Sequence, residues 1–254
     1  RWTLILEIRS RRGAPVVEAF DRAVTACDRS LSIDPNRAAV HERMSHLYWR
    51  WADLVNDRGG DPEPFLDQSI AAANRAIEFD PESVAAFFTR GGALTVTALR
   101  ELAGGRDPQS TLAEAVASFE AAIAIDPGAV LAHDDLGYAW ERLGRYQMGV
   151  GIDPRPALER AVNAFGRAID LNPAYANAYN NSGIALWRRA IYEKRTGADP
   201  RATLEEAVAA FDAAIERNPG YAYAFANRGL AGRTLAEQEF LSDEDPTETL
   251  DRAR

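Results

Sequence analysis

The segment GIDPRPALERAV at residues 151–162 returns as GADPRATLEEAV at residues 197–208, which is 46 residues further along the chain. Both copies begin with Gly-x-Asp-Pro-Arg and end with Ala-Val. Asp is a favourable N-cap, Pro fits the first turn of a helix, and a preceding Gly can end the helix before it. The segment therefore predicts a turn between two helices, and its return predicts a repeated helical unit.

Two series of prolines keep the same 46-residue spacing. The first series follows Asp or Asn and comprises Pro35, Pro81, Pro127, Pro173 and Pro219. The second series lies in the Gly-x-Asp-Pro turns or follows Asp, and comprises Pro62, Pro108, Pro154, Pro200 and Pro246. Each unit should contain a helix of about 20 residues, a turn and a helix of about 17 residues. We expect one array of about five and a half units over residues 1–254, with no domain boundary inside it.

Apolar and small residues recur at fixed places in each unit. Leu158, Val162 and Ile169 fall on one face of a helix because they are separated by four and seven residues. Ten residues after the first-series prolines stand only small residues, namely Ser45, Gly91, Gly137, Gly183 and Gly229. Glycine inside a helix costs about 1 kcal/mol relative to alanine, so its recurrence predicts close helix–helix contact. No alternating strand pattern is present, and the predicted fold class is all-α.

These positions resemble the tetratricopeptide repeat. The pattern of small residues, an aromatic residue and a terminal proline is carried by Ala115, Phe119, Ala122 and Pro127, by Ala161, Phe165, Ala168 and Pro173, and by Ala207, Phe211, Ala214 and Pro219. The resemblance implies a superhelical solenoid of antiparallel helix pairs. The usual period of that family is 34 residues, so the 46-residue period implies that both helices are lengthened around the turn between them. HEAT and armadillo repeats, with periods near 40–47 residues, are the alternative, but they do not predict this set of positions.

The segments Gly151–Val162 and Gly197–Val208 are also similar to long tetratricopeptide arrays attached to bacterial serine/threonine protein kinases. That resemblance implies a cytoplasmic regulatory or interaction region of a larger signalling protein. No glycine-rich phosphate loop, His-Arg-Asp or Asp-Phe-Gly motif occurs, so a kinase domain would lie outside these residues and we expect no enzymatic activity within them. Residues 1–12 and 246–254 are expected to be parts of further helices, as in a segment of a longer chain.

The resemblance also implies a ligand groove. In the family, groove positions fall four, seven, eleven, fourteen and fifteen residues after the first-series proline. The candidates are Glu42, His46, Trp49, Arg50, Phe88, Thr95, Asp134, Tyr138, Glu141, Arg142, Asn177, Asn180, Trp187, Arg188, Tyr223 and Arg233. Asn can pair with a peptide backbone, and Trp and Arg are frequent binding hot spots. Some candidates could instead pack between helices, but we expect Asn177, Asn180, Arg142 and Arg188 to be exposed.

The charge distribution favours the same surface. The chain has a net charge of -9, but the predicted first helices with their exits carry +7 and the remaining segments carry -16. A basic-leaning groove would favour a ligand with some negative charge, although solvated helix faces are an equally good explanation. The acidic total argues against non-specific nucleic-acid binding. No apolar run reaches the roughly 18 residues that a membrane span requires.

Few residues indicate chemistry at a site. Cys27 is the only cysteine, which excludes an internal disulfide framework and a cysteine-rich metal site. His41 and His133 share a position held elsewhere by aromatic residues, so both are predicted to pack rather than to bind metal, and no cofactor is expected. Lys194 is the only lysine and lies outside the groove positions, so capture of a chaperone's C-terminal carboxylate is not predicted. The sequence favours a protein- or peptide-binding scaffold; the alternative is a structural solenoid that associates end to end through uncapped helices.

Overall fold

The computed structural model describes residues 16–241 and 246–253, and over these two ranges every regular element is an α-helix. The first helices of the pairs, here called A helices, are α3 (Ala38–Asp57), α5 (Val84–Ala103), α7 (Val130–Gly149), α9 (Ala176–Arg195) and α11 (Ala222–Leu241). The second helices, here called B helices, are α2 (Val16–Ile33), α4 (Glu63–Phe79), α6 (Gln109–Ile125), α8 (Arg155–Leu171), α10 (Arg201–Arg217) and α12 (Thr247–Ala253). Each A helix has 20 residues and each of α4, α6, α8 and α10 has 17, so the predicted fold class and helix lengths are confirmed. The helix expected at residues 1–12 lies outside the described residues.

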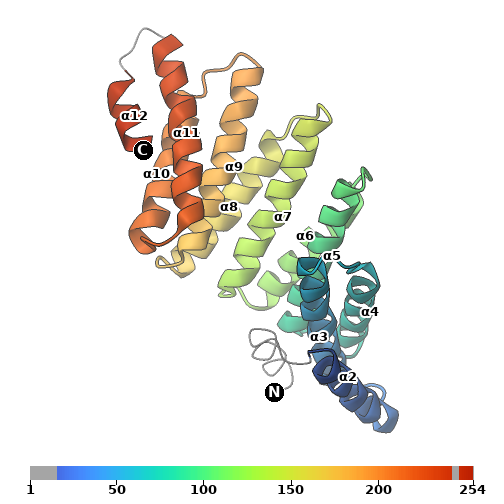
Figure 1. Cartoon of the computed structure of the whole chain (residues 1–254). Helices are drawn as coiled ribbons and strands as arrows, with labels where there is room; N and C mark the ends of the chain where they lie inside the picture. The colour runs from blue at the N-terminus through green and yellow to red at the C-terminus, as the bar shows by residue number, and fades with distance from the viewer. Residues whose placement is uncertain (1–15, 242–245, 254) are drawn as a thin grey trace. The chain divides into compact units, whose positions relative to one another are not determined.

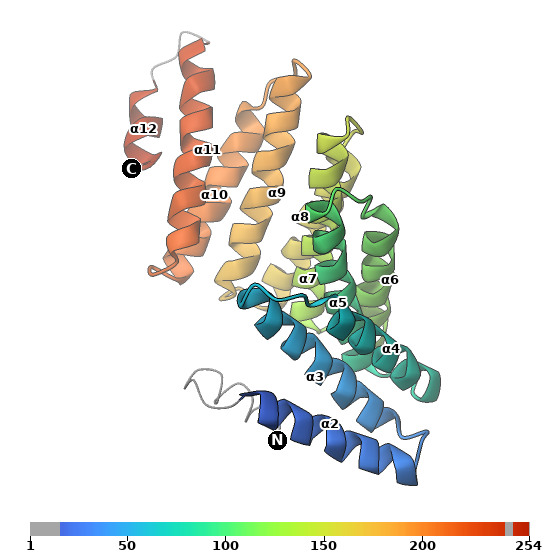
Figure 2. The same ribbon diagram turned by 45° about the vertical axis from the view of Figure 1, so that its right-hand side comes forward.

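The chain divides into two compact units, Arg1–Pro127 and Gly128–Arg254. In the first unit, α3 packs against α4 and α5 packs against α6, with α4 also in contact with α5. In the second unit, α9 lies between α7 and α11, while α8 and α10 pack against these A helices (Figures 1 and 2). Each unit is therefore a row of helix pairs. A single continuous array across residues 1–254 stays a prediction.

The second-series turns are built as the sequence predicts. The side chains of Asp61, Asp107, Asp153 and Asp199 each accept a hydrogen bond from the backbone N–H two residues on, at 3.0–3.1 Å. The glycines of these turns adopt the left-handed conformation, with φ of 75°, 73°, 81° and 80° at Gly59, Gly105, Gly151 and Gly197. The residue after each glycine closes the preceding helix, as when Ile152 N–H donates to the Gln147 carbonyl at 2.8 Å. The 46-residue spacing of these turns thus sets where one helix ends and the next begins.

The recurrent small residue of the A helix explains how the pairs pack. A Cβ atom on Gly137 would lie 2.7 Å from the ring of Phe165, and one on Gly183 would lie 2.7 Å from the ring of Phe211. Both phenylalanines are fully buried, and Gly91 in the first unit meets Phe119 in the same way. At the equivalent positions of the first pair, a larger Ser45 accompanies a smaller Ala73, and both are fully buried. The predicted close helix–helix contact is confirmed.

Candidate ligand-binding face

The predicted groove residues differ widely in exposure. Four are exposed, namely Arg50, Asn177, Tyr223 and Arg233. Eight are half-buried, namely Glu42, His46, Trp49, Phe88, Tyr138, Arg142, Trp187 and Arg188. Four are buried, namely Thr95, Asp134, Glu141 and Asn180. The groove positions inferred from the repeat therefore include both surface residues and residues that hold neighbouring helices together.

In the first unit Trp49 and Phe88 pack α3 against α5. The ring of Trp49 lies against Gly92, where a Cβ atom would be 2.7 Å from the indole, and it meets Phe88 edge to face at 6.1 Å. Thr95 donates its hydroxyl hydrogen to the carbonyl of Gly91 at 2.8 Å within its own helix. Trp49 therefore supports the packing of α3 against α5, while Thr95 is buried and bonded within α5.

In the second unit a polar seam joins the A helices. Asn181 Nδ2 donates to Asp134 Oδ1 at 3.2 Å, and Asn227 Nδ2 donates to Asn180 Oδ1 at 2.9 Å. Arg188 Nε donates to Glu141 Oε1 further along the same helices. All three bonds join a residue to one 47 positions later, which is one residue more than the repeat. The seam therefore links α7 to α9 and α9 to α11 in a constant register.

This register overturns part of the expected exposure. Asn177 is exposed as predicted, but Asn180 is only 3% exposed because it faces Asn227 across the seam, so the expectation for Asn180 was wrong. The expectation that Arg142 and Arg188 are exposed is also corrected. Both are half-buried because each forms an ion pair with the buried carboxylate of Glu141.

Four polar residues of the seam region were not predicted from the sequence, namely Tyr175, Asn181, Tyr221 and Asn227. The hydroxyl of Tyr175 donates to Asp134 Oδ2 at 3.1 Å, and burial and then the charge of Asp134 raise the pKa of Tyr221. Asn181 and Asn227 lie eight residues after a first-series proline, which is outside the positions that the family uses for its groove. The signal in the sequence that could have identified Asn181 and Asn227 is the presence of polar partners 47 residues earlier, instead of the 46 residues of the repeat.

Two adjacent carboxyl groups make the N-terminal part of α7 electrostatically unusual. Burial raises the pKa of Asp134, while hydrogen bonds from Asn181 and Tyr175 oppose that increase. Burial and then the charge of Asp134 raise the pKa of Asp135 to about 7. Burial and then the charge of Asp134 also raise the pKa of Tyr175. These shifts follow from burying acidic groups in one small region of α7 and α9.

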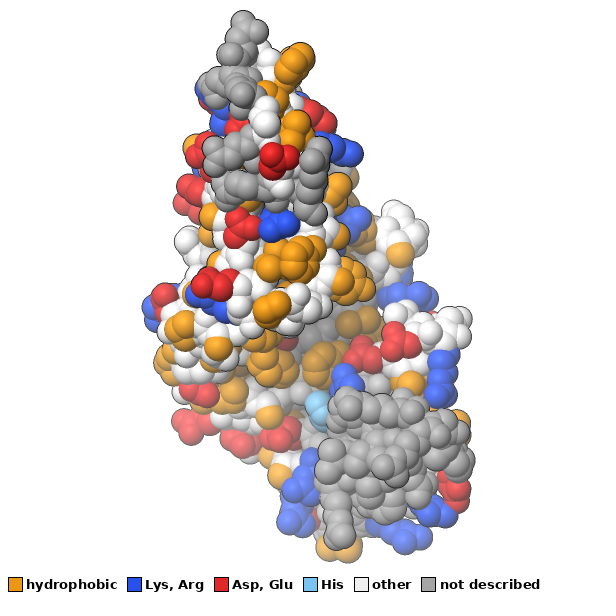
Figure 3. Space-filling model, turned by 60° about the vertical axis from the view of Figure 1, so that its left-hand side comes forward, with side chains coloured by type: hydrophobic (Ala, Val, Ile, Leu, Met, Phe, Trp, Pro, Cys, Tyr) orange, Lys and Arg blue, Asp and Glu red, His pale blue; other side chains and the backbone are white. Residues whose placement is uncertain are grey.

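Two lines of side chains flank the seam and remain accessible. Four residues after the prolines stand Leu131, Asn177 and Tyr223, all exposed, with Leu131 at 56% and Tyr223 at 75%. Eleven residues after the prolines stand Tyr138 and Ile184, which are half-buried, and Leu230, which is exposed. We call Leu131, Tyr138, Asn177, Ile184, Tyr223 and Leu230 the A-helix face. Elsewhere too, hydrophobic side chains at the surface lie beside charged ones (Figure 3).

The histidines and the cysteine that the sequence singles out pack within the fold. His133 is buried, and His41 accepts or donates a hydrogen bond with the Pro35 carbonyl at 2.8 Å while its ring lies 5.6 Å from that of Phe79, so both pack as predicted. Cys27 is half-buried, and burial raises the pKa of its thiol, which opposes nucleophilic reactivity. Within residues 16–241 and 246–253 no group of three His, Cys, Asp or Glu side chains could hold a metal ion. None of the helices in that part of the chain is long and apolar enough to cross a membrane.

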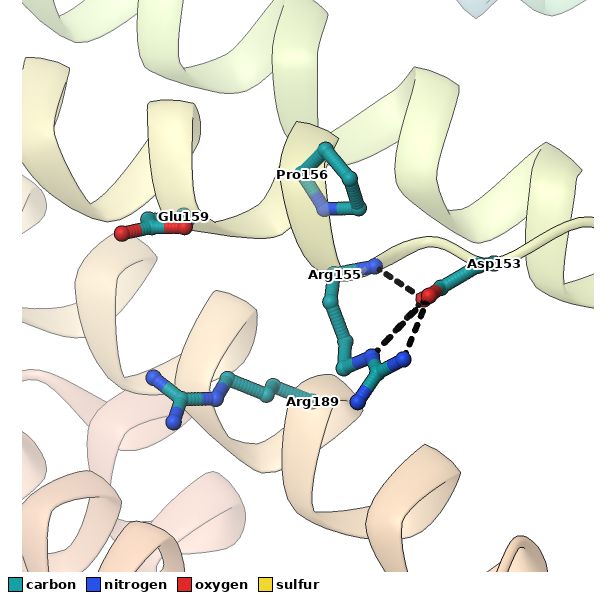
Figure 4. A pocket seen from close by; sticks show the side chains of 5 residues that line it. All are labelled: Asp153, Arg155, Pro156, Glu159 and Arg189. Atoms are coloured by element: carbon teal, nitrogen blue, oxygen red, sulfur yellow. Dashed lines mark hydrogen bonds and ion pairs between the residues drawn. The ribbon is translucent and has the colours of Figure 1, made fainter.

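A polar pocket of about 350 Å³ lies at the turn between α7 and α8 (Figure 4). It is lined by Asp153, Arg155, Pro156, Glu159 and Arg189. Arg155 is held by Asp153 at 2.6 Å, and Arg189 Nε donates to Glu193 at 2.8 Å. The same Asp153 accepts the backbone N–H of Arg155 at the start of α8, so the Asp153–Arg155 pair helps to build the turn.

Comparisons with known proteins define the fold. The sequence matches no protein-family model and no curated protein at a significant level. Among solved structures, YrrB, described as a tetratricopeptide protein with an unusual peptide-binding site, aligns with a TM-score of 0.54 and 21% identity over 90% of each chain. A double mutant of MamA from strain RS-1 aligns with a TM-score of 0.52 and 16% identity, over 87% of this chain and 94% of that one. Human IFIT1, solved as a dimer with m7Gppp-AAAA, aligns with a TM-score of 0.51 and 14% identity, over 92% of this chain and 46% of that one.

These similarities support the tetratricopeptide type of helix pairing over the HEAT and armadillo alternative. At these identities they concern the fold alone. The chain is therefore an all-α protein of consecutive helix pairs packed as in tetratricopeptide proteins.

Proposed function

We propose that this chain is a protein- or peptide-binding scaffold and that the A-helix face of its second unit contacts the ligand. The observation that carries the proposal is that α7, α9 and α11 carry both side chains that join the helices and side chains that are exposed beside them. The polar seam fixes the helices, while Leu131, Asn177, Tyr223 and Leu230 beside it stay exposed to solvent. Tyr138 and Ile184 are half-buried against the core between these exposed residues. Rigid elements that present accessible side chains in a regular array suit the recognition of an extended segment.

The chemistry of the accessible residues also supports a polypeptide ligand. Leu131, Tyr223 and Leu230 expose apolar area, which is typical of protein interaction sites when it is contiguous and bordered by polar groups. Asn177 is exposed beside them and offers both a donor and an acceptor to a peptide backbone. YrrB, which has a similar fold, contains a peptide-binding site, and this is consistent with such a use here.

The wider role follows from the sequence resemblance. We propose that the chain is the interaction region of a larger bacterial signalling protein, such as a serine/threonine protein kinase, and acts in the cytoplasm by binding rather than by catalysis. The test of this context is the gene sequence on both sides of the segment. A kinase domain in the same reading frame would support it, and an unrelated enzyme or a secretion signal would contradict it.

The binding proposal can be tested by selecting ligands from a random twelve-residue peptide library and measuring the affinity of purified peptides by fluorescence anisotropy. N177A/Y223A should weaken binding at least tenfold, because it removes an amide and an aromatic side chain from the A-helix face. The matched control is N163A, which alters an exposed asparagine on α8. Failure to select any peptide, or equal losses in N163A and N177A/Y223A, would show that the A-helix face is not the binding surface.

End-to-end association remains a second proposal because one observation favours it. Phe240 and Leu241 at the end of α11 are 71% and 73% exposed. Large apolar side chains at a helix end can stack against a second copy of the chain. Sedimentation velocity over a hundredfold concentration range should then show assembly that F240S/L241S abolishes, and a monomer throughout that range would exclude it.

A further inference from the structure

Three charged side chains form a cluster where the C-terminal halves of α7 and α9 meet. The carboxylate of Glu141 is only 2% exposed. Arg188 Nε donates a hydrogen bond to its Oε1. Arg142 Nε lies 3.2 Å from Oε2, in an ion pair that lacks hydrogen-bond alignment. Two cations thus surround one anion, and the cluster keeps a formal charge of +1.

Both arginines face the carboxylate with Nε, which leaves their terminal nitrogens unused. A guanidinium carries five N–H donors, four of them on the two terminal nitrogens. Among the described residues, Arg142 and Arg188 have no other ion-pair or hydrogen-bond partner. These terminal nitrogens are also not among the buried polar atoms without a partner, so they reach the surface. The side chains retain 18% and 19% exposure, which agrees with an accessible outer edge.

The positions of the two guanidinium groups are fixed before any ligand arrives. The Arg142 guanidinium carbon lies 4.3 Å from the centre of the Tyr138 ring, a cation–π contact. Arg188 is fixed by its hydrogen bond to the buried Glu141. An arginine held in this way loses little side-chain entropy when it binds, and its planar edge matches the two oxygens of a carboxylate or a phosphate.

The repeat itself does not require this cluster. At the positions of Glu141 and Arg142, the other A helices carry the pairs Trp49 and Arg50, Thr95 and Val96, Trp187 and Arg188, and Arg233 and Thr234. One arginine would suffice to neutralise Glu141 and to join α7 to α9. The second arginine adds a net positive charge and further donors at the surface, next to Tyr138 of the A-helix face.

From this geometry we infer that Arg142 and Arg188 form a clamp for the oxyanion of an acidic residue in the bound peptide, with Glu141 as the positioning residue. This inference rests on the proposed peptide-binding function and names the chemistry of the ligand at one point of the face. The oxyanion can come from an Asp or Glu side chain, a phosphorylated serine or a terminal carboxylate. All three present oxygens that can accept two parallel N–H bonds from a guanidinium.

The test uses the full chain and peptides selected from the random library, synthesised with an amidated C-terminus. For each peptide, its acidic residue is replaced in turn by Gln and by phosphoserine, and a third version carries a free C-terminal carboxylate. In the wild-type protein, the Gln peptide should bind at least tenfold more weakly than the parent. Tighter binding of the phosphoserine or free-carboxylate version would support the clamp and identify that group as the better source of the oxyanion.

Three variants show whether the discrimination comes from the clamp. R142M removes one arm and leaves Glu141 paired with Arg188, so the preference for the acidic peptide should fall about threefold or more. E141Q/R142M/R188M removes the clamp without leaving a buried charge, and should bind the acidic and Gln peptides equally. R50M, which alters the equivalent arginine of α3, is the matched control and should keep the full preference.

Two results overturn the inference while leaving the proposed function intact. One is selection of peptides with no acidic residue whose loss matters, and the other is a preference that persists in a folded E141Q/R142M/R188M protein. If the library yields no peptide at all, the proposed function is wrong and the clamp is rejected with it. Circular dichroism of each variant verifies that the helices are intact before binding is compared.

Discussion

Replacing Gly183 with alanine tests whether the recurrent glycine sets the distance between paired helices. The added Cβ would lie 2.7, 2.8 and 2.9 Å from three atoms of the Phe211 ring. Carbon atoms pack best at about 3.5–4.0 Å, so the ring would have to move by roughly 0.8 Å or more. Phe211 is fully buried among close-packed neighbours, which leaves it no free space to enter.

The expected magnitude combines two opposing effects. Overpacking of a core by one methyl group costs about 1–3 kcal/mol. Alanine has a higher helix propensity than glycine by about 1 kcal/mol, which offsets part of that cost. Gly183→Ala should therefore lower the free energy of unfolding by about 0–2 kcal/mol.

Gly166 on α8 provides the matched control. A Cβ atom at Gly166 meets nothing within 4 Å, so Gly166→Ala should gain the helix propensity alone and raise stability by up to about 1 kcal/mol. Urea denaturation, monitored by circular dichroism, measures the free energy of unfolding of both variants. The two free energies should differ by about 1–3 kcal/mol. If Gly183→Ala is as stable as Gly166→Ala, the close contact with Phe211 does not limit the packing of the two helices.

Three further perturbations test other parts of the structure by urea denaturation. Gly197→Ala should cost about 1–2 kcal/mol because φ is 80° at this position, whereas Gly149→Ala, which also meets no neighbour but has no positive φ, should not destabilise the protein. The pKa of Asp135 is raised to about 7, so its contribution to the stability of the folded state is complete below about pH 4 and is lost as the pH rises through about 7. Asp135→Asn should remove that loss. If the variant and the wild type lose the same stability between pH 5 and pH 8, the assignment is contradicted. Arg188→Met should lower stability by about 1.5–3 kcal/mol because Glu141 loses its hydrogen bond, and E141Q/R188M should recover part of that loss; equal stability of the two variants would show that the ion pair does not act as described.

Most of the fold followed from local sequence rules. The Gly-x-Asp-Pro turns at Gly151 and Gly197 predicted a helix end and a helix start, because the left-handed glycine and the Asp cap act within a few residues. The recurrent glycine predicted close packing because a helix tolerates glycine poorly without a steric reason, and the contact with Phe165 confirms that reason. These inferences need no knowledge of how one unit is placed against the next.

The binding face was less predictable because its exposure depends on neighbouring helices. Groove positions were predicted for each A helix separately, by their distance from a proline. In the structure, a residue of one A helix contacts the residue 47 positions later on the next A helix. Glu141 is therefore buried by Arg188, and Asn180 by Asn227. Asn177, three residues before Asn180, remains exposed on the same helix.

The sequence by itself determined the all-α class, the 46-residue spacing, the helix lengths and the positions of the turns, since each depends on contacts within one helix or one turn. Only the tertiary structure decided that Glu141, Arg142 and Arg188 form one cluster and that Asn180 is buried while Tyr223 is exposed. The physical reason is the one-residue offset between adjacent A helices. A helix's own periodicity defines which residues share a face, but the offset and tilt of its neighbours decide which of them are covered.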